Sequence, residues 1–169
     1  ITHTDADHIS GYEELFSESD VEGIRIDNFI MPETGTEDDE YQKLKRMALK
    51  KGIHVYTISA GMTIKNDMLK LTCLHPESEY ICEDRNEYST VLDLNFGAFS
   101  ALFTGDIQGE GEKKMMARIE HAYTLLKCAH HGSANSTPAE FLAMTRPQLC
   151  FISCGKDNNY GHPHPELIE

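Results

Sequence analysis

The first third of the chain alternates apolar and polar positions in a way that predicts a strand, a helix and a second strand. Residues 24–30 alternate with a period of two, the pattern of a half-buried strand. A helix follows, with Thr36 as its expected N-cap, acidic residues in its first turn and Gly52 at its end. Residues 54–58 predict the next strand. This β-α-β order favours an α/β domain built of packed layers.

The middle of the chain predicts neighbouring strands followed by a helix. Residues 69–73 alternate as a half-buried strand. Residues 89–94 and 99–104 are expected to form a hairpin around a turn that contains Gly97. Residues 112–122 then carry the spacing of a helix with one apolar face.

The last third of the chain adds two strands and another helix. Residues 124–128 predict a strand, and Thr137 followed by Pro138 has the arrangement of an N-cap and a first helical turn. Residues 148–153 predict a further buried strand. We expect one domain over residues 1–169. Because the chain opens on a polar motif without a leading Met or strand, we expect it to be a fragment of a longer protein.

Composition places the chain among globular domains. It has 169 residues, of which 40% are hydrophobic and 25% charged, enough for a proper core. No apolar run reaches the ~18 to 20 residues of a membrane span. The five cysteines are odd in number and include no Cys-x-x-Cys pair, and we expect no disulfide framework in a domain of this size. Cys73, Cys128 and Cys150 fall in apolar strand patterns and are expected in the core.

The charge balance limits how the chain can bind nucleic acid. Its formal net charge is −13, whereas proteins that bind DNA through the phosphates alone are usually basic. Bound divalent ions would place positive charge where a phosphate binds. Any DNA contact is therefore expected to depend on metal.

The beginning of the chain concentrates groups that bind metals. His3, Asp5, Asp7 and His8 place two imidazoles and two carboxylates within six residues. Such groups repel one another unless a cation draws them together, and nitrogen with oxygen ligands suits zinc, manganese or iron. From these residues alone, a solvated acidic loop is the alternative.

Further polar residues follow the apolar strands, which favours the metal site. Asp106 comes directly after residues 99–104, where a carboxylate can bridge two ions ~3.5 to 4 Å apart. His130 and His131 follow the next strand, and we expect one of them to face the site. Ser133, two residues later, is a candidate donor to a phosphate oxygen.

Four more candidates lie in other loops. His162 follows a glycine and is a candidate metal ligand, and His164 is expected to cap the next helix or to orient its neighbour. Asn86 and Ser89 are candidates for a ligand, a substrate contact or plain loop capping. A serine-nucleophile hydrolase is disfavoured because no Gly-x-Ser-x-Gly motif occurs.

These motifs, in this order, resemble the metallo-β-lactamase superfamily, and more closely the metallo-β-lactamase domain of the ComEC family of DNA-internalisation competence proteins. The stretches that carry the resemblance are residues 2–11, 86–92, 102–107, 126–136 and 152–166. Asp5 stands where most members of the superfamily have His. The resemblance implies an αββα sandwich, here expected to lack its N-terminal strands.

The resemblance also implies a site for two divalent ions, Mn²⁺ or Zn²⁺. The implied ligands are His3 and Asp5 for one ion, Asp7 and His8 for the other, Asp106 for both, and His131 or His162 as the late ligand. Asn86 and Ser89 occupy the region in which most members supply another His. That difference favours an ion that tolerates oxygen ligands, such as manganese.

The implied activity is two-metal hydrolysis of DNA, with Asp7, His131 and Ser133 in catalytic roles and His130 nearby. In the family this domain belongs to a membrane channel that imports single-stranded DNA. We therefore expect a membrane-associated protein with the domain on the extracytoplasmic side, the cytoplasmic side being the alternative. Two other functions stay open: a free-standing hydrolase of another phosphodiester or ester, and a binding module without turnover.

Overall fold

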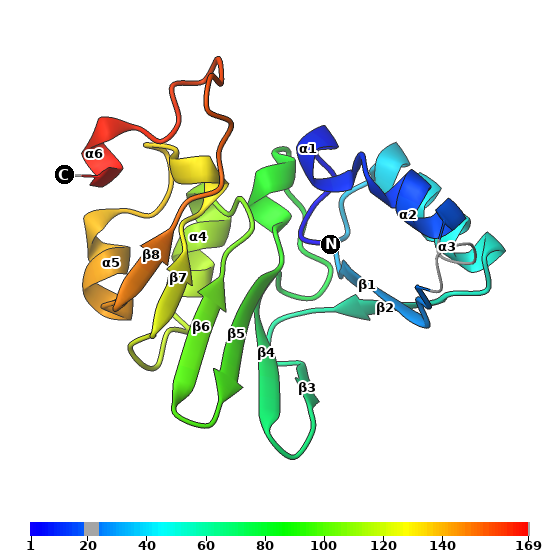
Figure 1. Ribbon diagram of the computed structural model, residues 1–169, viewed down its shortest axis with the longest axis horizontal. Helices are drawn as coiled ribbons and strands as arrows, with labels where there is room; N and C mark the ends of the chain where they lie inside the picture. The colour runs from blue at the N-terminus through cyan, green and yellow to red at the C-terminus, as the bar shows by residue number, and fades with distance from the viewer. Residues whose placement is uncertain (19–23, 169) are drawn as a thin grey trace.

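The computed structural model describes residues 1–18 and 24–168, and its elements follow the order of an α/β protein (Figure 1). The helices, with 3-10 turns marked η, are α1 (Ala6–Ile9), α2 (Tyr12–Glu18), α3 (Asp39–Lys50), η1 (Arg85–Tyr88), α4 (Gly109–Met116), η2 (His130–Gly132), α5 (Ala139–Thr145) and α6 (Pro165–Ile168). The strands are β1 (Asn28–Pro32), β2 (His54–Ile58), β3 (Thr63–Lys65), β4 (Leu69–His75), β5 (Val91–Phe96), β6 (Phe99–Phe103), β7 (Leu125–Lys127) and β8 (Leu149–Phe151).

The larger sheet has six strands in the order β3-β4-β5-β6-β7-β8. β3 to β6 pair antiparallel, and β6, β7 and β8 pair parallel. The hairpin of β5 and β6 is confirmed; Gly97 turns it with φ of +59°, which glycine adopts without steric cost. Because β6, β7 and β8 run in one direction, the loops that follow them emerge at the same edge of the sheet (Figure 1).

The six-stranded sheet buries one core against α4 and α5. Val91, Leu102 and Leu126 from β5, β6 and β7 are fully buried there, together with Met115 from α4 and Phe141 from α5. The sheet is thereby a rigid base for the loops at its edge.

The smaller sheet pairs β1 with β2 in parallel, and α3 connects them, which confirms the predicted β-α-β segment. Phe29 and Met31 of β1 pack against Leu44 and Ala48 of α3, and Phe16 of α2 joins this second core. The helices of the two cores lie at opposite ends of the molecule in Figure 1. The layers therefore follow the order helix, sheet, sheet, helix.

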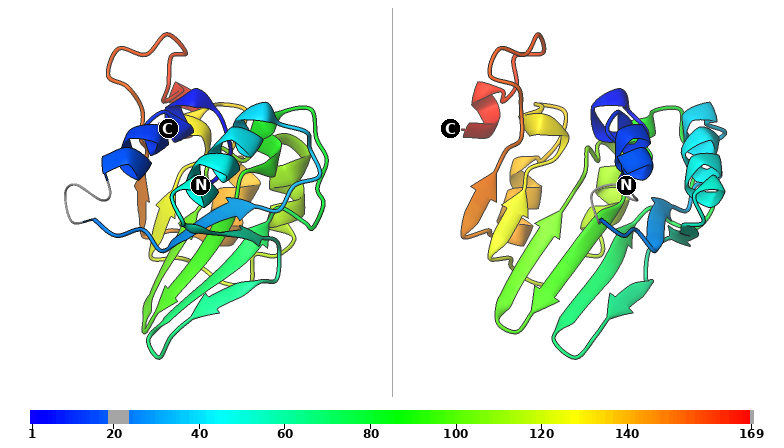
Figure 2. Two further views of the ribbon diagram at one scale, coloured as in Figure 1. Left: turned by 90° about the vertical axis from the view of Figure 1, so that its right-hand side faces the viewer. Right: turned by 45° about the vertical axis from the view of Figure 1, so that its right-hand side comes forward.

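The first two residues connect the two sheets (Figure 2). The amino group of Ile1 donates to the carbonyl of Ile30 in β1 at 2.8 Å. The carbonyl of Thr2 accepts from the backbone N–H of Thr90 at 3.0 Å, just before β5. The residues that follow, beginning with His3, are thus held where the two sheets meet.

Two predicted helix starts are wrong for the same reason: another contact uses the expected cap. Asp38, not Thr36, caps α3, and its carboxylate accepts from the backbone N–H groups of Glu40 and Tyr41. The Thr36 hydroxyl binds the carbonyl of Cys82 instead. Thr137 has φ of +55° and lies outside α5. Its hydroxyl accepts from a backbone N–H of the preceding loop.

Other boundaries shift because sequence patterns do not locate turns sharply. β1 begins four residues later than the predicted strand over 24–30, and α4 covers Gly109–Met116 where the pattern predicts 112–122. The prediction that 148–153 is buried is wrong, because in the described chain β8 is the last strand of its sheet and pairs with β7 alone. Cys150 is accordingly exposed, whereas Cys73 and Cys128 are buried as predicted.

Candidate metal centre

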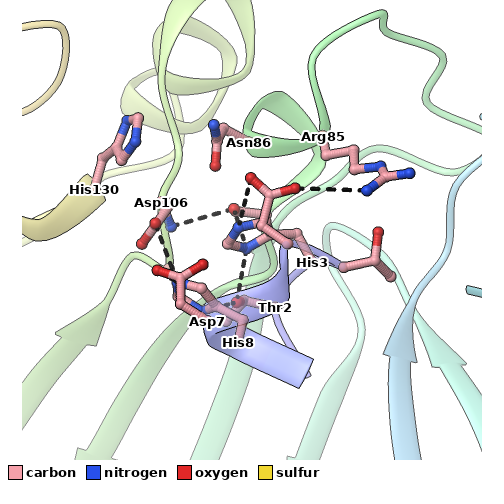
Figure 3. A network of polar contacts seen from close by, with 12 residues as sticks. Thr2, His3, Asp7, His8, Arg85, Asn86, Asp106 and His130 are labelled. Atoms are coloured by element: carbon pink, nitrogen blue, oxygen red, sulfur yellow. Dashed lines mark hydrogen bonds and ion pairs between the residues drawn. The ribbon is translucent and has the colours of Figure 1, made fainter. Parts of the chain in front are cut away.

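The opening motif lies at the sheet edge where β6 and β7 end (Figure 3). α1 begins directly after Asp5, so Asp7 and His8 sit on a single helical turn. Asp106 follows β6 through the turn at Gly105, where a Cβ would come within 2.9 Å of the Thr2 side chain. Glycine at that position allows the loop after β6 to touch the opening motif.

Four side chains meet there with spacings that suit one divalent ion. Oδ2 of Asp106 lies 3.1 Å from Nε2 of His8 and 3.0 Å from Nε2 of His131. Oδ2 of Asp7 lies 3.0 Å from the same His131 nitrogen and 3.8 Å from that of His8. Ligand atoms ~2.0 to 2.1 Å from a tetrahedral ion lie roughly 3.4 Å apart. We call Asp7, His8, Asp106 and His131 the four-residue group.

The hydrogen bond on the far side of His131 determines which of its nitrogens faces the group. Nδ1 of His131 donates to the carbonyl oxygen of Ser153 at 2.6 Å. Nε2 therefore keeps its lone pair and points toward Asp7 and Asp106. Protein metal sites fix the tautomer of a ligating histidine in this way.

Asp106 is the carboxylate best placed to stay ionised. Burial alone would raise its pKa, but the hydrogen bond with His8 and the electrostatic interactions with His8, Lys127 and His131 hold the pKa well below its usual range. Lys127 Nζ lies 3.6 Å from Oδ1 and donates to the carbonyl of Gly105 at 2.9 Å. The carboxylate is thus charged and fixed, as a bridging ligand must be.

Three buried polar atoms, one within the four-residue group and two beside it, have no hydrogen bond to any described residue. They are Nε2 of His3, Oδ1 of Asn86 and Oδ1 of Asp106. Figure 3 shows all three side chains at the same edge of the sheet. Burying unpaired polar atoms is costly, so their convergence fits a cation that would pair them.

His3 is kept neutral, with Nδ1 engaged on its other side. The ring is fully buried, and burial is the main reason that its pKa is lowered to about 4. Its Nδ1 lies 3.1 Å from the hydroxyl of Thr2 and 3.2 Å from that of Ser89. The Ser89 hydroxyl also accepts from the backbone N–H of Asp106 at 3.2 Å. Ser89 thus positions one ring and one carboxylate of the site.

Asp5 faces two partners from the edge of the site. Its Oδ2 lies 3.8 Å from Nε2 of His3, and its Oδ1 lies 3.8 Å from Arg85. Burial raises its pKa, and the charge of Arg85 opposes that rise. The contact of Arg85 with the site could not be predicted from the sequence, because a lone arginine in a polar loop belongs to no recognisable pattern.

His130 lies beside the four-residue group but outside it. The turn η2 has φ of +46° at His130 and +55° at His131, and the two rings lie edge to face with centroids 6.2 Å apart and planes at 66°. Nδ1 of His130 lies 2.8 Å from Oε1 of Gln108, whose amide nitrogen donates to Asp84 at 2.5 Å. These two hydrogen bonds orient the amide of Gln108 so that its oxygen accepts from Nδ1 of His130. Nε2 of His130 is then the unprotonated nitrogen.

The remaining candidates, Ser133, His162 and His164, lie in the loops after β7 and β8. His162 is stacked on His131, with ring centroids 6.4 Å apart and planes 20° apart. The hydroxyl of Ser133 is buried and accepts from the backbone N–H of Asn135 at 3.2 Å. His164 connects the loops after β7 and β8, because its Nδ1 accepts from the backbone N–H of Ala134 at 3.0 Å.

A buried carboxylate on α4 holds the other end of the loop that carries His131. Oε1 of Glu112 accepts from the backbone N–H of Thr137 at 2.7 Å, and the residue is 5% exposed. Burial raises the pKa of Glu112 to about 7. The burial of Glu112 could not be predicted from the sequence, since an acidic residue early in a helix usually faces solvent.

Glu112→Gln should remove a pH-dependent loss of stability. The folded pKa of about 7 lies above the ordinary 4.5, so the contribution of Glu112 is full below pH 4.5 and is lost as the pH rises through 7. That loss is about 3 kcal/mol in the free energy of unfolding. Gln keeps the acceptor for Thr137 and does not ionise, so the melting temperature of the variant relative to wild type should rise between pH 5 and pH 8.

The matched control is Glu110→Gln on the same helix. Glu110 is exposed and pairs with Lys113 at 2.5 Å, so this variant should show no gain with rising pH. Equal pH profiles of Glu112→Gln and wild type would show that Glu112 is not held in a low-dielectric site.

The chain is similar to one known protein over its whole length and to others over about half of it. No protein-family model matches the sequence. The chain is 30% identical over 170 aligned positions to ComE operon protein 3 of Bacillus subtilis, covering 100% of this chain and 21% of that protein. It is 34% identical over 84 positions to Recombination protein 2 of Haemophilus influenzae, covering 50% of this chain and 10% of that protein. The chain thus spans about a fifth of the first relative's length.

A third relative and two solved structures complete the comparison. Competence protein ComA of Neisseria gonorrhoeae is 34% identical over 82 positions, covering 47% of this chain and 12% of that protein. CmlA, a diiron β-hydroxylase from Streptomyces venezuelae, superposes with a TM-score of 0.58 at 14% identity, covering 89% of this chain and 34% of that one. The metallo-β-lactamase fold protein YhfI from Bacillus subtilis gives 0.57 at 12%, covering 88% and 60%. At these identities the structural likeness concerns the fold alone.

Proposed function

Because the chain is a metallo-β-lactamase-fold, ComEC-like protein, we propose that it is a metal-dependent phosphodiesterase domain that hydrolyses DNA. The observation that carries the proposal is the four-residue group, whose ligand atoms converge at one edge of the sheet. The competence and recombination names of the relatives support DNA as the substrate. The net charge of −13 makes a contact through metal the favourable route to a phosphate.

In this proposal two divalent ions, Mn²⁺ or Zn²⁺, share Asp106. Asp7, His8 and His131 would hold one of them with Oδ2 of Asp106. His3, Asp5 and Asn86 would hold the other with Oδ1 of Asp106, which is supported by the unpaired buried atoms of His3, Asn86 and Asp106. Bound ions of this kind supply Lewis acidity and positive charge to a phosphodiester in hydrolysis. Oxygen atoms outnumber nitrogen atoms in the second set, which favours manganese there.

The chain's own residues orient the site and provide a proton acceptor. Lys127 balances the charge of Asp106. The hydroxyl of Ser89 accepts from the backbone N–H of Asp106 and fixes the backbone there. The unprotonated Nε2 of His130 can accept a proton at the mouth of the site and return it to the leaving oxygen. The hydrogen bond that Nδ1 of His130 donates to Oε1 of Gln108 keeps Nε2 free. In this role His130 acts beside the ligands.

The proposed setting is a membrane-associated DNA-uptake protein with this domain on its extracytoplasmic side. The support is the similarity to proteins named for competence, of which the chain covers about a fifth or less. In the described part of the chain, no helix is long and apolar enough to cross a bilayer.

The test is hydrolysis by protein reloaded with a single metal. Metal-stripped protein should hydrolyse bis-p-nitrophenyl phosphate and a DNA oligonucleotide after addition of Mn²⁺ or Zn²⁺, and a chelator should stop both reactions. Metal content is measured on the same samples. Full occupancy of the site without hydrolysis of either substrate would contradict the proposal and favour a binding module.

A further inference from the structure

The loop after β8 forms one wall of a pocket that opens onto the four-residue group. The pocket has a volume of about 420 Å³, and its lining includes Asp7, His131, Asn158, Tyr160 and His162. Asp7 and His131 belong to the four-residue group, so the pocket begins where a phosphate would be held. Tyr160 lies in the wall and is 78% exposed.

Three rings in this wall lie nearly parallel. Tyr160 stacks on His162 with centroids 5.7 Å apart and planes 27° apart. His162 stacks in turn on His131, with centroids 6.4 Å apart and planes 20° apart. The rings therefore form an aromatic ladder that starts at a proposed metal ligand and ends at an open tyrosine face. An exposed aromatic face of this kind is a typical surface for stacking a planar ligand.

Asn158 holds the ladder in place with all of its hydrogen-bonding capacity. Its Oδ1 accepts from the backbone N–H groups of Tyr160 at 3.1 Å and His162 at 2.9 Å. Its Nδ2 donates to the carbonyls of Gly155 at 2.8 Å and His162 at 2.6 Å. The loop is thus fixed before any ligand binds, which lowers the entropic cost of binding.

We propose that this pocket is a nucleobase subsite, in which Tyr160 stacks a base of single-stranded DNA while the adjoining phosphate occupies the metal centre. The inference rests on the proposed function for its substrate class, and it adds a preference for unpaired strands. A base inside a duplex already stacks on its neighbours and cannot offer a face to Tyr160. Aromatic stacking accepts any base, so the subsite selects single strands without selecting sequence.

Tyr160→Ala should raise KM for a single-stranded oligonucleotide about 10-fold, with most of the effect in KM and not in kcat, because base stacking contributes to binding. Tyr160→Phe keeps the ring and should restore a KM close to that of wild type. The matched control is Tyr56→Ala, since Tyr56 is 55% exposed on β2 and does not line this pocket. It should behave as wild type.

A second measurement reports stacking without hydrolysis. An oligonucleotide that contains 2-aminopurine loses fluorescence when that base stacks, and the protein has no Trp to interfere. With Zn²⁺-loaded protein and an oligonucleotide whose phosphodiester linkages are replaced by hydrolysis-resistant ones, wild type and Tyr160→Phe should quench the base, and Tyr160→Ala should not. Replacing that nucleotide with an abasic one should weaken binding to wild type and leave binding to Tyr160→Ala nearly as it was.

The outcomes separate this inference from the proposed function. If wild type hydrolyses DNA and Tyr160→Ala matches Tyr56→Ala in both KM and quenching, the subsite is wrong and the phosphodiesterase stands. If quenching depends on Tyr160 but no substrate is hydrolysed, the subsite stands and the phosphodiesterase is wrong. Equal KM for duplex and single-stranded DNA in wild type would also overturn the subsite.

Discussion

Asp106→Asn is expected to lower the metal-dependent hydrolysis of bis-p-nitrophenyl phosphate by roughly 1,000-fold. One oxygen of Asp106 faces His8 and His131, and the other is buried without a hydrogen bond in the described chain. Asn replaces one oxygen with an NH₂ group, which donates hydrogen bonds and does not ligate a cation. The substitution also removes the charge that balances Lys127 at 3.6 Å. Both effects should reduce the affinity of the site for a pair of ions that share residue 106 as a ligand.

Asp93→Asn is the matched control for this result. Asp93 lies on β5, where it accepts from Asn95 and pairs with His121 at 3.4 Å, away from the four-residue group. The same chemical change there should leave hydrolysis within about twofold of wild type. Rates, metal content and thermal unfolding are measured on both variants, so that a folding defect is separated from a catalytic one. Hydrolysis by Asp106→Asn within tenfold of wild type, at equal metal content, would contradict the bridging assignment.

The parts of the site that sequence reasoning could locate are those tied to strand ends. Asp106 and His131 directly follow apolar runs, and the loops after parallel strands meet at one edge of a sheet. The opening motif could be added because its residue types alone suggest metal. Asp7 and His8 of that motif lie close to Asp106 and His131, and the roles of all four as metal ligands and in catalysis stay proposals.

The residues that sequence reasoning could not find act through long-range contacts. Arg85 reaches Asp5 across 80 positions of sequence, and Glu112 reaches Thr137 across 25 positions. Each is a charged residue in a polar or helical segment, where solvent exposure is the usual outcome. The exposed β8 shows the same limit, because its apolar run does not reveal that the strand lies at the edge of the sheet.

Helix caps show how a local rule is overridden by tertiary contacts. Thr36 and Asp38 both satisfy the preference for an N-cap, and the sequence offers no way to choose between them. Asp38 caps α3 because the same carboxylate also meets Tyr88, Thr4 and Arg85 from distant segments. One residue thereby joins the start of a helix, the turn η1 and the opening motif.

Asp38→Ala should therefore lower the free energy of unfolding by about 3 to 5 kcal/mol, an effect larger than the loss of a helix cap alone. The side chain is 1% exposed, and its Oδ1 accepts from the N–H groups of Glu40 at 2.9 Å and Tyr41 at 3.2 Å. Oδ2 accepts from the Tyr88 hydroxyl at 2.8 Å and lies 3.2 Å from Nε of Arg85. Alanine would leave these donors buried with fewer partners, which costs more than the bonds themselves contribute.

Two further variants separate the cap from the network in urea unfolding experiments. Asp38→Asn can keep the cap through Oδ1 but loses the charge beside Arg85, so its loss should lie between those of wild type and Asp38→Ala. Asp39→Ala changes an exposed acidic residue one position later and should cost less than about 1 kcal/mol.

The pH dependence gives an independent check on the role of Asp38. Burial would raise the pKa of Asp38, but hydrogen bonds from Thr4, Tyr88 and the backbone of Tyr41 outweigh it and hold the pKa below 3.8. Its stabilising contribution is therefore present above pH 3.8 and is lost as the pH falls through the lowered value. Wild type should lose more stability than Asp38→Ala on acidification below that pH. Parallel losses in the two proteins, or a cost of Asp38→Ala no larger than that of Asp39→Ala, would show that the opening motif is held in place by other contacts.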